Sequence, residues 1–162
     1  NHLYRNNGAK EGFSFTEVTS EAGVDDPRFS AGACFLDYDR DGREDVAISH
    51  LESPVSLLAN RTSKPGQFLA VRLVATATSR DAIGTRVTVR KGDWQRTRQL
   101  TAGDGYLASN QRQLVFGLGD HSTLDELIVE WPSGHSTRLT VVPAGREIVV
   151  VEGGSRFFEL PR

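Results

Sequence analysis

The chain has 162 residues and a formal net charge of −2, and hydrophobic residues make up 38% of it. This composition suits one folded domain or two small ones and excludes wholesale disorder. The sequence has no apolar run long enough to span a membrane. Its mild acidity, with no basic reading helix, argues against nucleic-acid binding. Because it contains no methionine at all, the sequence is expected to be a processed or excised part of a longer protein.

Charge is unevenly distributed and divides the chain near residue 64. Residues 1–63 carry a net charge of −5, whereas residues 68–112 carry +5. Between them, residues 62–66 read Thr-Ser-Lys-Pro-Gly, a composition typical of a short linker. The sequence therefore predicts two domains, 1–63 and 64–162.

Short segments rich in β-branched and aromatic residues recur along both domains, separated by glycine, proline and aspartate turns. The first domain is expected to form strands over 2–6, 13–19, 33–38, 45–50 and 55–60. The second is expected to form seven antiparallel strands, over 68–74, 85–90, 94–100, 113–118, 126–131, 136–142 and 147–152. This pattern predicts an all-β protein, with a propeller-blade-like antiparallel sheet followed by a seven-stranded β-sandwich or open barrel.

An acidic loop joins the third and fourth predicted strands. Aspartates occupy loop positions one, three, five and nine, and a glycine occupies position six. Calcium takes six to eight oxygen ligands from flexible loops, often carboxylates on alternate residues together with a backbone carbonyl. The spacing therefore predicts a calcium site formed by the carboxylates of Asp37, Asp39, Asp41 and Asp45 and the backbone carbonyl of Arg43.

The loop is not an EF-hand, because position twelve is Ile48 rather than a bidentate glutamate and the flanking segments are strands. The alternative interpretation is a solvated acidic turn, whose charge Arg40 and Arg43 offset.

The acidic loop and its flanking strands resemble the FG-GAP or VCBS repeat, the calcium-binding blade of integrin-like propellers. A weak internal repeat supports this resemblance, because Leu-Tyr-Arg-Asn over 3–6 is echoed by Leu-Leu-Ala-Asn over 57–60. The resemblance implies the same calcium ligands. One blade cannot close a propeller, so its apolar face is expected to pack on the second domain or on further blades.

The second domain resembles the ASPIC/UnbV domain, which follows such repeats in known proteins. Four motifs carry this resemblance in order: Ser-Arg-Asp-Ala-Ile-Gly over 79–84, Gly-Asp-Gly-Tyr-Leu over 103–107, Val-Phe-Gly-Leu-Gly over 115–119 and Val-Glu-Trp-Pro-Ser-Gly over 129–134. The resemblance implies a secreted or envelope protein and no established activity for this domain.

Basic residues gather in one predicted hairpin of the second domain. If residues 91–93 form a three-residue loop, one sheet face carries Arg86, Arg90, Trp94, Arg96 and Arg98. Such a face would suit an anionic polymer such as an acidic or sulfated glycan. A two-residue loop would split the set, and an ordinary solvated face remains the alternative.

No hydrolase elbow, phosphate-binding loop or dinucleotide fingerprint is present, and no histidine has metal-ligand spacing to another histidine or to the cysteine. Trp131, before a Pro-Ser-Gly turn, is expected to be a core residue rather than a sugar platform.

The sequence therefore predicts a non-enzymatic extracellular binding or adhesion module, in the C-terminal part of a larger protein, with a structural calcium site. Its expected partners are a protein or glycan outside the cell and preceding propeller blades. The expected location is extracellular, cell-surface or periplasmic. The alternative function is a carbohydrate-binding accessory domain of a larger surface or secreted enzyme.

Overall fold

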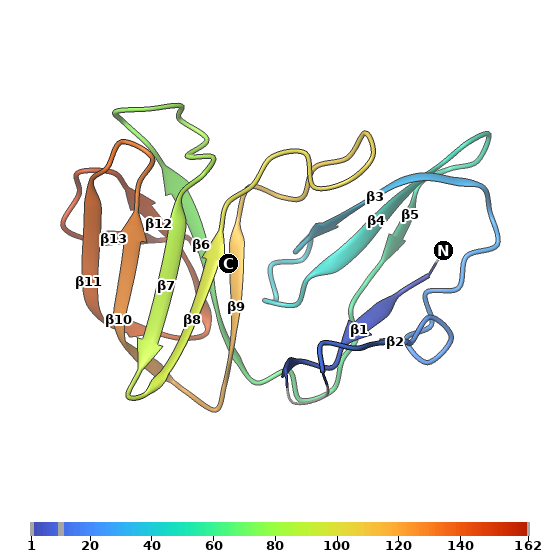
Figure 1. The fold of residues 1–162 in the computed structure, drawn as a ribbon, viewed down its shortest axis with the longest axis horizontal. Coiled ribbons are helices and arrows are strands. Elements are labelled where there is room, and N and C mark those ends of the chain that lie inside the picture. The colour runs from blue at the N-terminus through green and yellow to red at the C-terminus, as the bar shows by residue number, and fades with distance from the viewer. Residues whose placement is uncertain (1, 10–11, 162) are drawn as a thin grey trace.

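The computed structural model describes residues 2–9 and 12–161, and these residues contain thirteen strands and no α-helix. The strands form four open sheets, which Figure 1 shows as a sandwich of two sheets beside two smaller sheets from the start of the chain. The predicted all-β class is confirmed. The twelve predicted strands are all present, most of them with ends shifted by one to three residues.

The first part of the chain forms two small antiparallel sheets. The strands β1 (Tyr4–Asn6) and β2 (Phe15–Glu17) pair as a ribbon. The strands β3 (Ser30–Leu36), β4 (Asp45–His50) and β5 (Ser56–Leu58) form a meander in sequence order. The acidic loop connects β3 to β4, as predicted.

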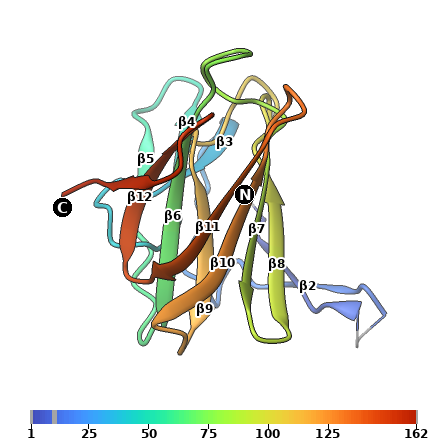
Figure 2. The same cartoon turned by 90° about the vertical axis from the view of Figure 1, so that its left-hand side faces the viewer.

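The second part of the chain forms the sandwich. Its strands are β6 (Gln67–Val74), β7 (Arg86–Lys91), β8 (Trp94–Gln99), β9 (Leu114–Gly119), β10 (Thr123–Glu130), β11 (Ser136–Pro143), β12 (Arg146–Val151) and β13 (Phe157–Glu159). One sheet has the order β11-β10-β7-β8 and the other β13-β12-β6-β9, and Figure 2 shows the two layers from the side.

Alternating apolar residues on the facing sides of the two sheets build the main core. Val87 and Val89 of β7 and Leu127 of β10 are completely buried on one side, and Leu69 and Val71 of β6 are completely buried on the other. Side chains from the inner faces of two packed sheets interdigitate in this way because each strand exposes alternate residues to one face. This packing explains why the strands of the second part can be predicted from the alternation of apolar and polar residues in the sequence.

The sandwich differs from the predicted seven antiparallel strands in two respects. An eighth strand, β13, adds to the edge of β12, and its three residues are too short to give a periodic signal. In addition, β12 pairs with β6 in parallel. The chain reaches β12 only after crossing to β10 and β11 in the other sheet, and such a long connection permits a parallel pair.

The three-stranded sheet of the first part keeps apolar side chains exposed on both faces. Phe35 on one face is 45% exposed and Leu57 on the other is 48% exposed. Of the two expected coverings, the sandwich does not cover these residues, and packing on further blades stays a prediction. Instead, the segment after Leu100 reaches across: the Gln111 amide donates to the Phe35 carbonyl at 2.9 Å, and the Asn110 side chain accepts from the Phe35 amide at 2.8 Å.

Candidate metal centre

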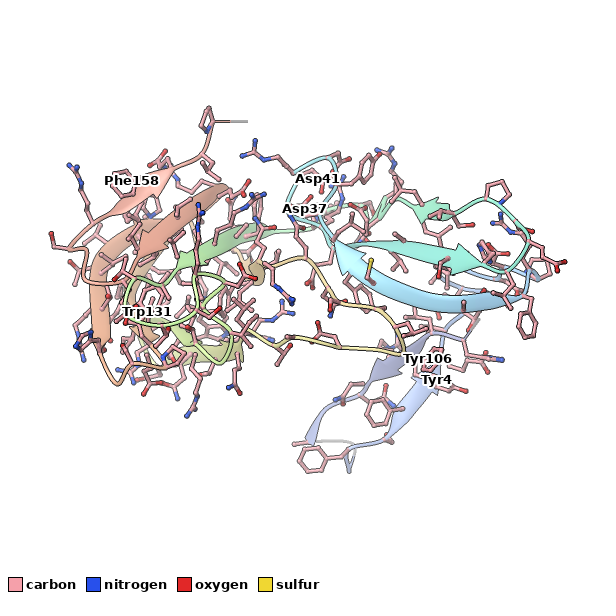
Figure 3. The ribbon with its side chains drawn as sticks, turned by 90° about the horizontal axis from the view of Figure 1, so that it is seen from above. Tyr4, Asp37, Asp41, Tyr106, Trp131 and Phe158 are labelled. Carbon is pink, nitrogen blue, oxygen red and sulfur yellow. The ribbon has the colours of Figure 1, made fainter. Side chains whose placement is uncertain are left out.

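The acidic loop lies at the end of the three-stranded sheet that is nearest the sandwich, and Figure 3 shows Asp37 and Asp41 there. Its turn depends on Gly42, which has a φ of +88°. A Cβ at this position would lie 2.3 Å from the Phe68 ring of β6. Only glycine meets both demands, so the middle of the loop approaches the sandwich directly.

Three carboxylates converge in this loop. One oxygen from each of Asp37, Asp39 and Asp45 lies within 4.8 Å of the other two. Calcium–oxygen distances are about 2.3–2.6 Å, so two oxygens on one ion lie at most about 5 Å apart. Asp37 and Asp45 are buried at 4% and 2% exposure, and Asp39 is exposed. The donor set and its spacing therefore fit a hard divalent cation.

The two other predicted ligand residues make a different contact. The Asp41 carboxylate pairs with the Arg43 guanidinium and accepts the Arg43 amide at 2.9 Å. The Arg43 Nε also donates to the Asn60 carbonyl at 2.7 Å. The structure brings Asp37, Asp39 and Asp45 together and turns the Asp41 side chain toward Arg43. Arg43 therefore offsets one loop carboxylate, as the solvated-turn interpretation expects, whereas Arg40 pairs with Glu147 of β12 instead. The calcium site stays a prediction.

Burial raises the pKa of the Asp37 carboxyl, and the negative charges of Asp41 and Asp45 raise it further. Amide donation from Gly42 at 2.9 Å and from Asp41 at 3.0 Å acts in the opposite direction on this pKa but does not cancel the rise. A buried carboxylate beside like charges is stabilised when a cation binds. This electrostatic environment is what a metal ion would relieve.

Backbone amides hold the third carboxylate in place. The oxygens of Asp45 accept the Tyr38 amide at 3.1 Å and the Asn60 amide at 2.7 Å. The Asp37 amide, in turn, donates to the Gln111 side chain at 2.8 Å. The loop is thus fixed both to the end of β5 and to the long segment that follows β8.

Comparison with known families identifies the family to which the second part of the chain is similar. The sequence profile of the ASPIC and UnbV family matches residues 75–157, just over half of the chain. The chain belongs to the ASPIC and UnbV family. The four motifs identified in the sequence all fall inside the matched range. No curated protein matches the chain. The FG-GAP or VCBS resemblance concerns residues before the match and stays a prediction.

The ASPIC and UnbV region begins just after β6 and includes β7 to β12. Its Trp131 is 4% exposed, and the indole N–H donates to the Thr137 hydroxyl at 2.9 Å. The prediction of a core tryptophan is confirmed. Within the described residues, the structure has no helix long and apolar enough to cross a membrane.

The predicted arginine face in the ASPIC and UnbV region is wrong in its register. The hairpin loop has two residues, so Lys91 pairs with Trp94, Val89 with Arg96, and Val87 with Arg98. Gly92, with a φ of +52°, stands at the first loop position, which type II′ turns favour. One residue fewer in the loop reverses the relative facing of the two strands.

The five residues therefore divide between two faces. Arg86 and Arg90 lie on the outer face, where Glu126 of β10 pairs with Arg90 at 3.2 Å. Trp94, Arg96 and Arg98 share the inner face with the core valines of β7, and Trp94 packs against the core. Since β8 is the last strand of its sheet, its two arginines lie at the border of the core.

A buried polar network that the sequence analysis did not predict lies at the other end of the three-stranded sheet. Asp26 accepts from Arg28, and the Ser56 hydroxyl donates to Asp26 at 2.9 Å. The His50 Nε2 lies 3.0 Å from the Ser56 Oγ and 3.4 Å from Asp26. In a catalytic triad the serine and the aspartate contact opposite ring nitrogens, so this arrangement is a structural one. Asp26 and Ser56 are 30 positions apart, so no local sequence pattern predicts this network.

Proposed function

We propose that this chain is a non-enzymatic binding or adhesion module that acts outside the cytoplasm, as part of a larger protein. The convergence of Asp37, Asp39 and Asp45 in a loop that also contacts the sandwich is the observation that carries the proposal. Membership of the ASPIC and UnbV family supports a β-rich module. The exposed apolar residues on both faces of the three-stranded sheet support an interaction with further blades or with a partner.

In this proposal the residues before the ASPIC and UnbV region are a calcium-binding blade of the FG-GAP or VCBS kind. Asp37, Asp39 and Asp45 would hold the ion, and the predicted Arg43 carbonyl would add a fourth ligand. Asp41, the other predicted ligand, would have to leave its contact with Arg43 to join them. The ion would supply charge neutralisation and no chemistry. By stabilising the loop, it would stabilise the angle between β3 and β4 and the contact of Gly42 with Phe68.

Calcium dependence suits an extracellular or periplasmic location, because extracellular calcium modules bind with dissociation constants of about 10⁻⁴ to 10⁻³ M. The test is the thermal unfolding temperature of the full chain in calcium, in magnesium and in a chelator. At calcium a hundred times above Kd, the gain in unfolding free energy is expected to be about 2.7 kcal/mol. Equal unfolding temperatures in chelator and at a calcium concentration a hundred times this Kd would refute the calcium site.

A carbohydrate-binding accessory domain is the second candidate. One observation favours it: Trp94 is only partly buried, and the Arg96 guanidinium lies 5.8 Å from the centre of its ring. Aromatic rings beside cations are suited to sugars that carry acidic groups. A screen of glycans against the wild type and Trp94→Ala would distinguish this candidate, since loss of a glycan signal in the variant supports it.

A further inference from the structure

Two strands of the sandwich have an unpaired edge on the same side of the molecule. In the order of each sheet, β8 ends one and β9 ends the other, and the described strands add nothing beyond them. Figure 1 shows both on the side of the sandwich that faces the first part of the chain. An unpaired edge presents free backbone donors and acceptors to any extended segment that approaches.

The register identifies which groups of β8 are free. The Leu100 amide donates to the Thr85 carbonyl at 2.9 Å, directly after the end of the β7–β8 ladder. In an antiparallel pair, residues bonded to the neighbour alternate with residues that point away from it. Every second residue before Leu100, namely Arg98, Arg96 and Trp94, is therefore hydrogen-bonded to β7. The N–H and C=O groups of Gln95, Thr97 and Gln99 therefore point to the open edge.

A groove lies between the two edges and is lined by arginine. Arg96, Thr97 and Arg98 form one wall, Val115 and Gly117 of β9 form the other, and about 460 Å³ is open between them. Arg98 donates to the Val115 carbonyl and so links the two walls. Among the residues that the structure describes, no ion pair involves Arg96, whose cation lies over Trp94 and faces the open part.

A contact within the molecule shows that these arginines can pair with a carboxylate. Glu44, from the end of the acidic loop, reaches the Arg98 guanidinium at 3.4 Å, and both side chains are about 40% exposed. Arg96 stands two residues before Arg98 and therefore points to the same face of β8. A second carboxylate placed two residues from the first on an added strand would meet Arg96.

Charge also argues against other occupants of this edge. An apolar strand would bury the Arg96 cation without an anionic partner, and inward-pointing charges protect natural sheet edges in this way. A second copy of β8 paired antiparallel about Thr97 would place Arg96 opposite Arg98, and like charges directly opposite destabilise a pair. A strand with acidic residues at alternate positions avoids both penalties.

We propose that β8 binds, by strand addition, an extended acidic peptide segment of a partner protein. The free groups of Gln95, Thr97 and Gln99 would bond to its backbone, and alternate carboxylates would pair with Arg96 and Arg98. Main-chain hydrogen bonds give such complexes their affinity, and alternate side chains give them specificity. This inference deepens the proposed binding function by naming the class of partner, and it does not depend on calcium.

The test is amide hydrogen exchange of the full chain with a short capped peptide of alternating glutamate and valine. Exchange at Gln95, Thr97 and Gln99 is expected to slow with the peptide, whereas exchange at Trp94, Arg96 and Arg98 is expected to change little, since those amides already bond to β7. A peptide with glutamine in place of glutamate should bind more weakly, by up to about fivefold for each of the two charge pairs that it loses. Added salt should weaken binding of the glutamate peptide.

Arg96→Gln should reduce the affinity for the glutamate peptide about fivefold. Arg86→Gln is the matched control, because Arg86 is an exposed arginine on the outer face of the neighbouring strand. Unchanged exchange at millimolar peptide, equal binding of a lysine–valine peptide, or equal affinity in Arg96→Gln would each overturn the proposal. So would slowed exchange caused by raising the protein concentration alone, which indicates a second copy. Binding of a heparin fragment with no protection of these amides would overturn it in favour of a glycan surface.

The peptide experiment is run both in calcium and in chelator. If calcium raises the unfolding temperature but no peptide slows the exchange, the edge proposal fails and the calcium module stands. If the peptide binds equally in both and calcium has no effect on unfolding, the edge proposal stands and the calcium site fails.

Discussion

The Arg40 Nε, in the acidic loop, donates to the Glu147 carboxylate on β12 at 2.7 Å, although 107 positions separate the two residues. Glu147 is 4% exposed and also pairs with Arg72 of β6. A second nitrogen of Arg40 donates to the Pro161 carbonyl at 2.8 Å. The loop that groups the three carboxylates is therefore attached to the sandwich by a cation of its own. Changes in the loop are expected to reach the sandwich through this contact.

Arg40→Gln should lower the unfolding free energy by about 1.5–3 kcal/mol, the range for a hydrogen bond to a charged group. The loss should be at the low end, because Arg72 still pairs with Glu147 in the variant. Chemical denaturation measures the change. Arg61→Gln serves as control, since Arg61 is exposed after β5. A loss no larger than that of the control would show that the contact does not stabilise the fold.

Asp39→Ala should lower the unfolding temperature in calcium more than in chelator. The substitution removes one of the three converging carboxylates, and it also relieves repulsion in the metal-free loop. Calorimetry of wild type and variant under both conditions gives the four temperatures needed. Glu52→Ala, an exposed acidic residue in the loop after β4, is the matched control. An equal loss in both conditions would mean that Asp39 supports the fold without a metal.

Gly42→Ala should destabilise the protein more than Gly134→Ala does. The two glycines have nearly the same φ, +88° and +87°, so the backbone penalty is matched. Only at Gly42 would the new methyl group meet the Phe68 ring, and nothing lies within 4 Å of a Cβ at Gly134. Overpacking of this kind typically costs about 1–3 kcal/mol. Equal unfolding free energies for the two variants would contradict the close approach of loop and sandwich.

Glu152 should make the protein sensitive to acid. Its carboxylate accepts the Ala77 amide at 2.9 Å and the Thr76 amide at 2.8 Å, and the Ser133 hydroxyl also donates to it. Donation from Ala77, followed by that from Ser133 and Thr76, lowers the pKa of this carboxyl below its ordinary value. A lowered pKa in the folded state contributes stability above the unfolded pKa of about 4.3, and this stability is lost as pH falls through the folded pKa.

The denaturation midpoint of Glu152→Gln should therefore lie below that of wild type at neutral pH, and the gap should narrow as the pH falls below about 4. Glu130→Gln is the control, because Glu130 is an exposed glutamate at the end of β10, in the other sheet. A gap that stays constant from neutral pH to pH 3 would show that the carboxylate's charge is not what stabilises these loops.

Local pattern determined the elements of this protein. The twelve predicted strands exist because each has its own alternation or apolar run and its own turn signals, as at Pro132 and Gly134. The acidic loop could also be predicted from local pattern, since Asp37 and Asp39 are two residues apart in a loop that turns at Gly42. These properties need no information from distant parts of the chain.

Tertiary structure decided the facing of β8, the pairing of β12 and the docking of the acidic loop. The sequence allowed a hairpin loop of two or three residues between β7 and β8. The loop has two residues, which places Trp94 against the core and divides the arginines between two faces. Likewise, the sequence allowed two roles for Arg43, as a calcium ligand through its carbonyl or as a counter-ion for Asp41. In the structure its guanidinium pairs with Asp41 and also donates to the Asn60 carbonyl. A one-residue shift reverses a strand face at little local cost, so only contacts with the rest of the fold can fix such choices.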